Sequence, residues 1–329
     1  MTIFSHRLLE KSPVPPYMVG MIVSLSCFFS YLAIASHAGL VEQTLSGEVS
    51  SIQLRASLTL MILIGYLPVA HWYLRRWSNE RIGELKKGFA LQDEARVPKE
   101  LILIFAGFFG WLAFVVLFLI VPDPNYLLIQ PWNWPLDYAA VVVAISLVGW
   151  GVGRFSFELI WTALHLTDIA KRLPDINLLD ADSFRPFTQQ GVQSALLIII
   201  LMSITGHLAF RPGNGLIGAS VFMTIMLVLT VSALIIPMRG IHKRIQARKC
   251  EELAVIREQI RRHKDNLLTG QDKTSDNLIV LLAMETRIER VPEWPFDIGS
   301  LSRFSFYLLL GLGSWVGAAL VERLLNTAL

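Results

Sequence analysis

The sequence has little charge for its length. Asp, Glu, Lys and Arg make up 17% of the 329 residues, whereas 53% are hydrophobic and the mean hydropathy is +0.52. A soluble domain usually carries about 25% charged residues, so a surface that faces water on all sides is excluded. The net charge of +3 is too small to indicate a basic footprint, which argues against a nucleic-acid partner.

Cysteines and catalytic motifs are also scarce. Cys27 and Cys250 are the two cysteines, and such a distant pair forms neither a disulfide framework nor a zinc cluster. The sequence has no HExxH motif, P-loop or nucleophile elbow. No Asp, Glu, Lys or Arg lies deep in an apolar run, which argues against proton-coupled transport. We therefore predict no catalytic residues, no metal site and no cofactor, in a chain that is not an enzyme.

Long apolar runs are what the sequence does have. A membrane-spanning helix needs about 20 mostly apolar residues, and such runs lie at roughly 17–38, 55–74, 101–121, 137–160, 192–210, 215–238 and 302–321. They lack the polar–apolar alternation of a β-barrel strand. The pattern predicts an all-α, multi-pass protein with seven transmembrane helices in a plasma or bacterial cytoplasmic membrane, where lipid surrounds the spans.

The Lys and Arg residues divide unequally between the two ends of these runs. Twenty-six lie on one side and three, Arg55, Arg211 and Arg323, on the other. Because basic residues stay on the cytoplasmic side, the N-terminus is predicted inside and the C-terminus outside. Ala33-Ile34-Ala35 resembles a signal-peptide cleavage site, but its apolar run exceeds the usual h-region of about 7–15 residues, so we favour a retained span.

This orientation divides the chain into four parts. Residues 1–16 form a cytoplasmic tail, 17–238 contain six spans, 239–301 form a cytoplasmic helical hairpin, and 302–329 contain the seventh span and an outer tail. The fourth span continues inward as a helix over 154–173. On this extension Arg154 and Glu158, four residues apart, predict a surface salt bridge.

The hairpin is predicted from two helical segments, 239–268 and 277–290, joined by a polar turn. An intermittent apolar stripe near heptad spacing follows the first segment. We interpret this stripe as a partner or subunit interface, although packing within one chain is an alternative. Its members are Ile241, Ile245, Leu253, Ile256, Ile260 and Leu267.

Small residues and sparse hydroxyl groups mark two of the spans. GxxxG spacing lets helix backbones approach closely, and it predicts helix packing at Gly149 and Gly153 in the fourth span and at Gly313 and Gly317 in the seventh. One face of the seventh span is mostly apolar, and a face of this kind can line a narrow pore. Its members are Arg303, Tyr307, Leu310, Ser314, Ala318 and Val321. Hydrogen bonds from the Tyr and Ser hydroxyls to neighbouring helices are the alternative.

In topology alone, this layout resembles the seven-helix ligand-gated ion channel superfamily that includes insect chemoreceptors. In that family inward helical extensions assemble the tetramer and the last span lines the pore. The resemblance implies these roles for 154–173, 239–268, 277–290 and 302–321. The family's Thr-Tyr…Gln-Phe signature is absent, because Phe306-Tyr307 stands in the last span without a Gln.

Two functions remain open from the sequence. The first is a homo-oligomeric, passive ion channel with the seventh span near the pore. The second is a non-catalytic scaffold or accessory subunit that docks a membrane-complex partner through the hairpin. An uncoupled transporter is disfavoured, since we find no inverted repeat.

Overall fold

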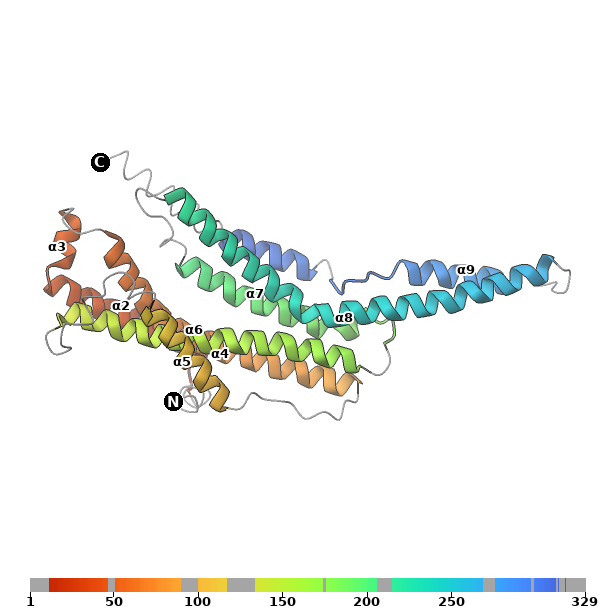
Figure 1. Ribbon diagram of the computed structural model, residues 1–329, viewed down its shortest axis with the longest axis horizontal. Helices are drawn as coiled ribbons and strands as arrows, with labels where there is room; N and C mark the ends of the chain where they lie inside the picture. The colour runs from red at the N-terminus through yellow and green to blue at the C-terminus, as the bar shows by residue number, and fades with distance from the viewer. Residues whose placement is uncertain are drawn as a thin grey trace.

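The computed structural model describes residues 12–46, 51–89, 100–116, 134–173, 176–205, 215–268, 276–296 and 299–311, with positions 313 and 317. Every regular element in these ranges is a helix, as the all-α prediction requires (Figure 1). The helices are α2 (Pro16–His37), α3 (Leu40–Leu45), α4 (Ser51–Phe89), α5 (Glu100–Val115), α6 (Leu136–Arg172), η4 (Ala181–Phe184), α7 (Arg185–Thr205), α8 (Gly215–Leu268) and α9 (Asp276–Glu289). A further helix over 299–311 is called the C-terminal helix below.

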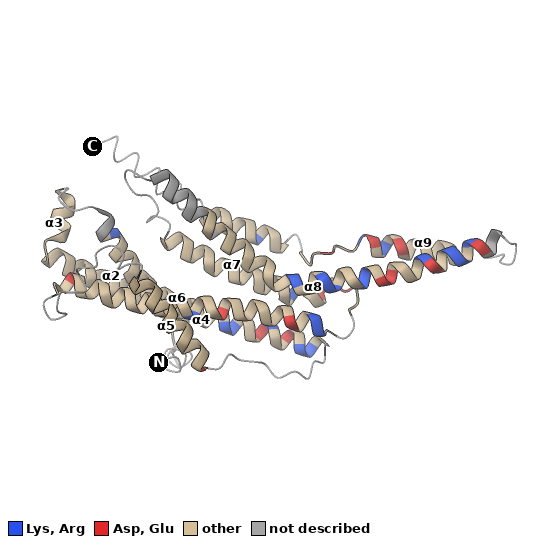
Figure 2. Ribbon diagram, in the orientation of Figure 1, with Lys and Arg blue, Asp and Glu red and all other residues tan. Residues whose placement is uncertain are grey.

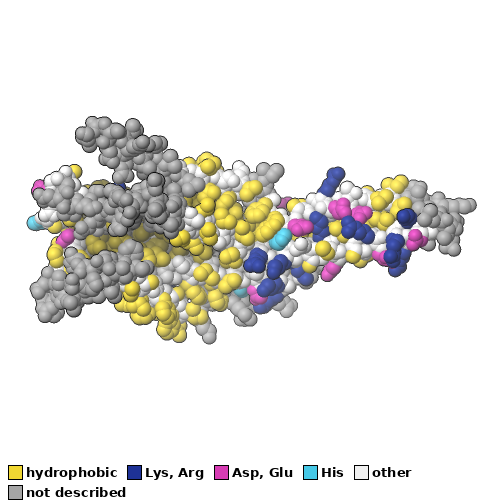
Figure 3. Space-filling view, turned by 45° about the horizontal axis from the view of Figure 1, so that its top comes forward, with side chains coloured by type: hydrophobic (Ala, Val, Ile, Leu, Met, Phe, Trp, Pro, Cys, Tyr) yellow, Lys and Arg dark blue, Asp and Glu magenta, His cyan; other side chains and the backbone are white. Residues whose placement is uncertain are grey.

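Four of these helices are long and apolar enough to cross a membrane. They lie at Pro16–His37, Leu54–Phe89, Leu136–Arg172 and Asp182–Thr205. Hydrophobic side chains cover the bundle in the space-filling view, whereas charged side chains gather on the projecting hairpin (Figure 3). A membrane protein is therefore the consistent interpretation. The seven-span count and the orientation stay predictions.

α6 runs without interruption from Leu136 to Arg172, so the expected extension of the fourth span is a continuous helix. Its apolar first half and charged end match the arrangement of α4, and the charged ends of both helices point the same way as the hairpin (Figure 2). A proline disfavours helical backbone at the residue that precedes it. α6 accordingly ends just before Leu173, which precedes Pro174.

The longest helix, α8, has 54 residues and contains Pro237. Its first part lies along the bundle, and its second part projects away with α9 beside it (Figure 1). Near Pro237 the helix is fastened to α6, because the Thr167 hydroxyl donates to the Ile236 carbonyl at 3.0 Å. A Cβ added at Gly240 would lie 2.7 Å from the Thr167 carbonyl oxygen, so the two backbones are close.

The main core lies where the bundle meets the hairpin. Leu166 of α6, Phe187 of α7, and Met238 and Ile241 of α8 are completely buried there. Phe304 of the C-terminal helix joins the same cluster. Burying apolar surface drives folding in water, so this core ties the spans to the polar part of the protein.

Candidate functional site

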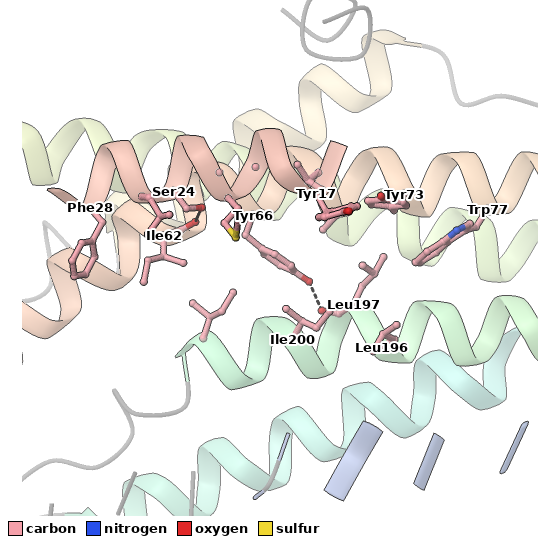
Figure 4. A pocket seen from close by; sticks show the side chains of 17 residues that line it. Tyr17, Ser24, Phe28, Ile62, Tyr66, Tyr73, Trp77, Leu196, Leu197 and Ile200 are labelled. Carbon is pink, nitrogen blue, oxygen red and sulfur yellow. Dashed lines mark hydrogen bonds between the residues drawn. The ribbon is translucent and has the colours of Figure 1, made fainter. Parts of the chain in front are cut away.

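An apolar groove of about 690 Å³ opens between α2, α4 and α7 (Figure 4). α2 and α4, which are close in sequence, form part of its wall, and the distant helix α7 completes it. The lining consists of Tyr17, Gly20, Met21, Ser24, Leu25, Phe28, Ile62, Gly65, Tyr66, Val69, Ala70, Tyr73, Trp77, Leu196, Leu197, Ile200 and Ile204. Its volume falls within the range of about 300–1,000 Å³ that small-molecule sites occupy.

Two glycines allow the α2–α4 wall to form. A Cβ added at Gly20 would lie 2.6 Å from a methyl carbon of Val69, and one added at Gly65 would meet the Gly20 carbonyl and Ser24. The Ser24 hydroxyl then donates to the Ile62 carbonyl on α4 at 2.8 Å. Small residues at such contacts let helices pack through their backbones.

A hydrogen bond joins α4 to the opposite wall of the groove. The Tyr66 hydroxyl on α4 donates to the Leu197 carbonyl on α7 at 2.5 Å. A phenol buried in apolar surroundings needs such a partner. The bond therefore fixes the separation of α4 and α7 across the groove.

The two ends of the groove differ in chemistry. Phe28 lies at one end, and Tyr17, Tyr73 and Trp77, which carry polar tips, lie at the other (Figure 4). From Ile62 to Trp77 the α4 wall rises about 22 Å at 1.5 Å per residue. This shape suits an extended hydrocarbon chain whose polar group lies at the aromatic end. The lining includes no carboxylate, imidazole or thiol for catalysis.

The predicted surface salt bridge between Arg154 and Glu158 is wrong, because both side chains are buried at 8% and 3% exposure. Glu158 Oε2 lies 3.9 Å from Nε2 of His71 on α4. α5 covers the other side, where a Cβ added at Gly107 would lie 3.1 Å from Cγ of Arg154. The spacing of four residues predicted that Arg154 and Glu158 lie on one face of α6. It did not predict that neighbouring helices cover this face.

The predicted pore face is only partly within the described residues. Arg303 and Leu310 are exposed on the C-terminal helix, while Tyr307 is half-buried against the main core. The remaining candidates, Ser314, Ala318 and Val321, lie outside the described residues.

The predicted packing glycines behave differently in the two spans. A Cβ added at Gly149 would lie 2.6 Å from Cβ of Phe114 on α5, and one added at Gly153 would lie 2.8 Å from Cα of Gly110. α5 and α6 are thus in close backbone contact, within one chain. Among described atoms, none lies within 4 Å of a Cβ added at Gly313 or Gly317, whereas Gly311 contacts Ile199 of α7.

The stripe on α8 packs within the chain. Ile241, Ile245 and Ile256 are buried in the main core, and Leu253 and Ile260 pack against it. The side chain of Leu267 lies outside the described residues. The described members of the stripe therefore pack within the chain, and a partner or subunit interface at this stripe stays a prediction.

On α9, several large apolar side chains face away from α8 and are exposed. Leu278, Leu281 and Ile288 are turned toward α8, as their reduced exposure shows. The side chains that remain exposed are Ile279 at 63%, Val280 at 58%, Leu282 at 45% and Met284 at 51%. We call these four residues the α9 surface.

Sequence reasoning missed the groove and the α9 surface. Two sequence features could have indicated the groove. They are the paired glycines of α2 and α4 and the aromatic residues near the predicted inner ends of both helices. Within the described residues no group of His, Cys, Asp and Glu side chains is arranged to hold a metal.

No family model, curated protein or solved structure matches the chain in comparisons with known proteins. The resemblance to the seven-helix ligand-gated channels therefore stays a prediction. Function must be argued from the geometry of this chain alone.

Proposed function

We propose that the chain crosses the membrane seven times, with its N-terminus and the α8–α9 hairpin inside. The distribution of 26 basic residues against three supports this orientation. The clustering of charge on the hairpin and on the adjoining ends of α4 and α6 agrees with it (Figure 2). Side-specific labelling of tags at both termini tests it, and two tags on one side would refute the odd number of spans.

The function we propose is that of a passive ion channel built from several copies of this chain. The observation that carries the proposal is the α9 surface. In the proposed orientation it lies outside the membrane, where four large apolar side chains in contact with water are unfavourable. A second chain that covers them removes this cost, and the hairpins are then the assembly elements.

The C-terminal helix supports the position of the pore. Phe304 and Gly311 anchor this helix on the core and on α7, whereas Arg303, Leu309 and Leu310 remain exposed. A helix held on one side can present its other side to an axis shared by several copies. Hydrophobic constrictions gate pores by excluding water. Gating of this kind does not require the transport of a second, coupled ion.

Assembly is tested by the double substitution Ile279→Glu and Met284→Glu. Two carboxylates on the α9 surface should turn the oligomer into a monomer in detergent, as measured by light scattering. Gln259→Glu, at an exposed polar position on α8, is the control. A wild-type particle that is already monomeric would contradict the channel.

Ion flux is tested with purified protein in liposomes. Wild-type protein should pass ions, and Ser314→Trp should block the flux by filling the pore. Leu101→Trp, at an exposed apolar position on α5, should leave the flux unchanged. Equal flux in both variants would place the pore elsewhere.

The α9 surface also supports a second function, that of a scaffold which docks a different membrane protein. Here the wild type is monomeric, and the same double substitution releases a defined partner rather than a second copy. The oligomeric state of the wild type separates the two functions.

A further inference from the structure

A second cavity, of about 540 Å³, lies at the base of the hairpin. The start of α7, the end of α9, and the segments 178–184 and 291–296 enclose it. Its lining consists of Leu178, Leu179, Asp182, Phe184, Arg185, Thr188, Ile245, Arg287, Arg290, Val291, Pro292, Trp294, Pro295 and Phe296. It is separate from the apolar groove, with which it shares no residue.

Three arginines line this cavity, Arg185, Arg287 and Arg290, against one acidic residue, Asp182, and all four side chains are exposed. Within the described part of the chain, none of the three arginines forms an ion pair. By contrast, Arg257 on the same hairpin binds both Glu285 and Glu289. Like charges around a shared cavity repel one another, so an anion that enters it gains from all three.

The walls of the cavity are held in place by hydrogen bonds. The Thr188 hydroxyl donates to the Pro295 carbonyl at 2.6 Å, which joins α7 to the segment after α9. Lys249 Nζ donates to the carbonyls of Glu289 and Val291 at 2.8 and 2.9 Å. These bonds fix the end of α9, where two of the arginines lie, so the cavity is prearranged.

An aromatic wall completes the cavity. The Trp294 ring stacks on His242, with centroids 4.1 Å apart and planes within 9°, and Phe296 stacks on Trp294 at 5.9 Å. Trp294 and Phe296 both line the cavity. The site thus combines groups for an anion with apolar surface for an organic body.

We propose that this cavity binds a phosphate ester. Guanidinium groups bind phosphate oxygens through paired hydrogen bonds. The volume exceeds what inorganic phosphate needs and suits an esterified phosphate, whose organic part packs against Trp294 and Phe296. The ester is either a phospholipid headgroup or a soluble organic phosphate.

Two probes distinguish these sources with the full-length protein. Glycerol 3-phosphate, titrated in detergent by calorimetry, represents the soluble ester. Nanodiscs of phosphatidylcholine with or without phosphatidylglycerol represent the headgroup, and the readout is the temperature of thermal unfolding. Calorimetric binding would support a soluble ester, and stabilisation by phosphatidylglycerol alone would support a headgroup.

The triple substitution Arg185→Gln, Arg287→Gln and Arg290→Gln should abolish either response. The triple substitution Arg261→Gln, Arg262→Gln and Lys264→Gln removes the same charge from exposed positions on α8 and should preserve it. Should the first triple variant not fold, Arg290→Gln alone should weaken binding about 10-fold, since it removes one charged hydrogen bond. No response to either probe, or equal losses in both triple variants, would overturn the proposal.

Discussion

The Tyr66 hydroxyl on α4 donates a 2.5 Å hydrogen bond to the Leu197 carbonyl on α7, across 131 positions of sequence. It links the second and fifth apolar runs beside the groove (Figure 4). Tyr66 is half-buried and lines the apolar groove, so few other polar groups surround this bond.

Tyr66→Phe should therefore destabilise the protein by about 1 kcal/mol, the usual net value of one hydrogen bond. Thermal unfolding of the purified protein in detergent measures the loss. Tyr73→Phe removes a hydroxyl from the same groove, at a position where no hydrogen bond joins two helices among the described residues, and should have little effect. Equal losses of stability in both variants would show that the hydrogen bond to Leu197 makes no specific contribution.

The groove can be tested with an acyl chain that carries a photoactivatable group. Wild-type protein should be labelled on peptides around Leu197 and Ile200, which line the groove. Ile200→Trp fills the groove and should reduce this labelling several-fold, as mass spectrometry of the peptides would show. Leu147→Trp, at an exposed position of α6, is the control. Labelling spread evenly over all apolar helices would contradict a specific groove.

The contact between α5 and α6 gives a third prediction. Gly153→Ala should cost about 1–3 kcal/mol, the range for overpacking, because the added methyl group would meet the backbone of Ala106 and Gly110. Gly313→Ala introduces the same methyl group where no described atom lies within 4 Å. It should be neutral or slightly stabilising, since Ala favours helix. Thermal unfolding compares the two variants.

The hairpin gives a fourth prediction. Arg257 on α8 donates to Glu285 and Glu289 on α9 at 2.7 and 2.6 Å. Arg257→Gln should speed hydrogen exchange of the α9 amides, and added salt should do the same to the wild type by screening these pairs. Arg261→Gln removes an arginine that pairs within α8 and should leave α9 exchange unchanged. Unchanged exchange in Arg257→Gln would mean that apolar packing alone holds α9.

Local patterns allowed the helices themselves to be predicted from the sequence. Length and hydropathy located the apolar runs. The lack of proline between Arg239 and Leu268 predicted that α8 continues beyond its apolar part. The helical segment 277–290, predicted after the polar turn, agrees with α9 within one residue at each end. Each of these signals depends on neighbours within a few turns.

Contacts between distant segments could not be read in the same way. Arg154 and Glu158 looked exposed because each supplies the other with a partner, yet both are buried, with α4 beside Glu158 and α5 beside Arg154. Ile241 and Ile245 looked available to a partner, yet they are buried in this chain's core. To predict the groove, one must know that residues of α2, α4 and α7 lie together. A single sequence does not reveal which faces of those helices meet.

The course of α8 has a mechanical consequence. At 1.5 Å per residue its 54 residues extend about 80 Å, and close to its middle the helix is fastened to α6 at Thr167. Pro237, which weakens helical hydrogen bonding locally, lies beside this attachment. The attachment at Thr167 therefore divides α8 into an arm that packs in the bundle and an arm that forms the hairpin. Because one continuous helix joins the two arms, the core of the bundle also holds the base of the hairpin in place.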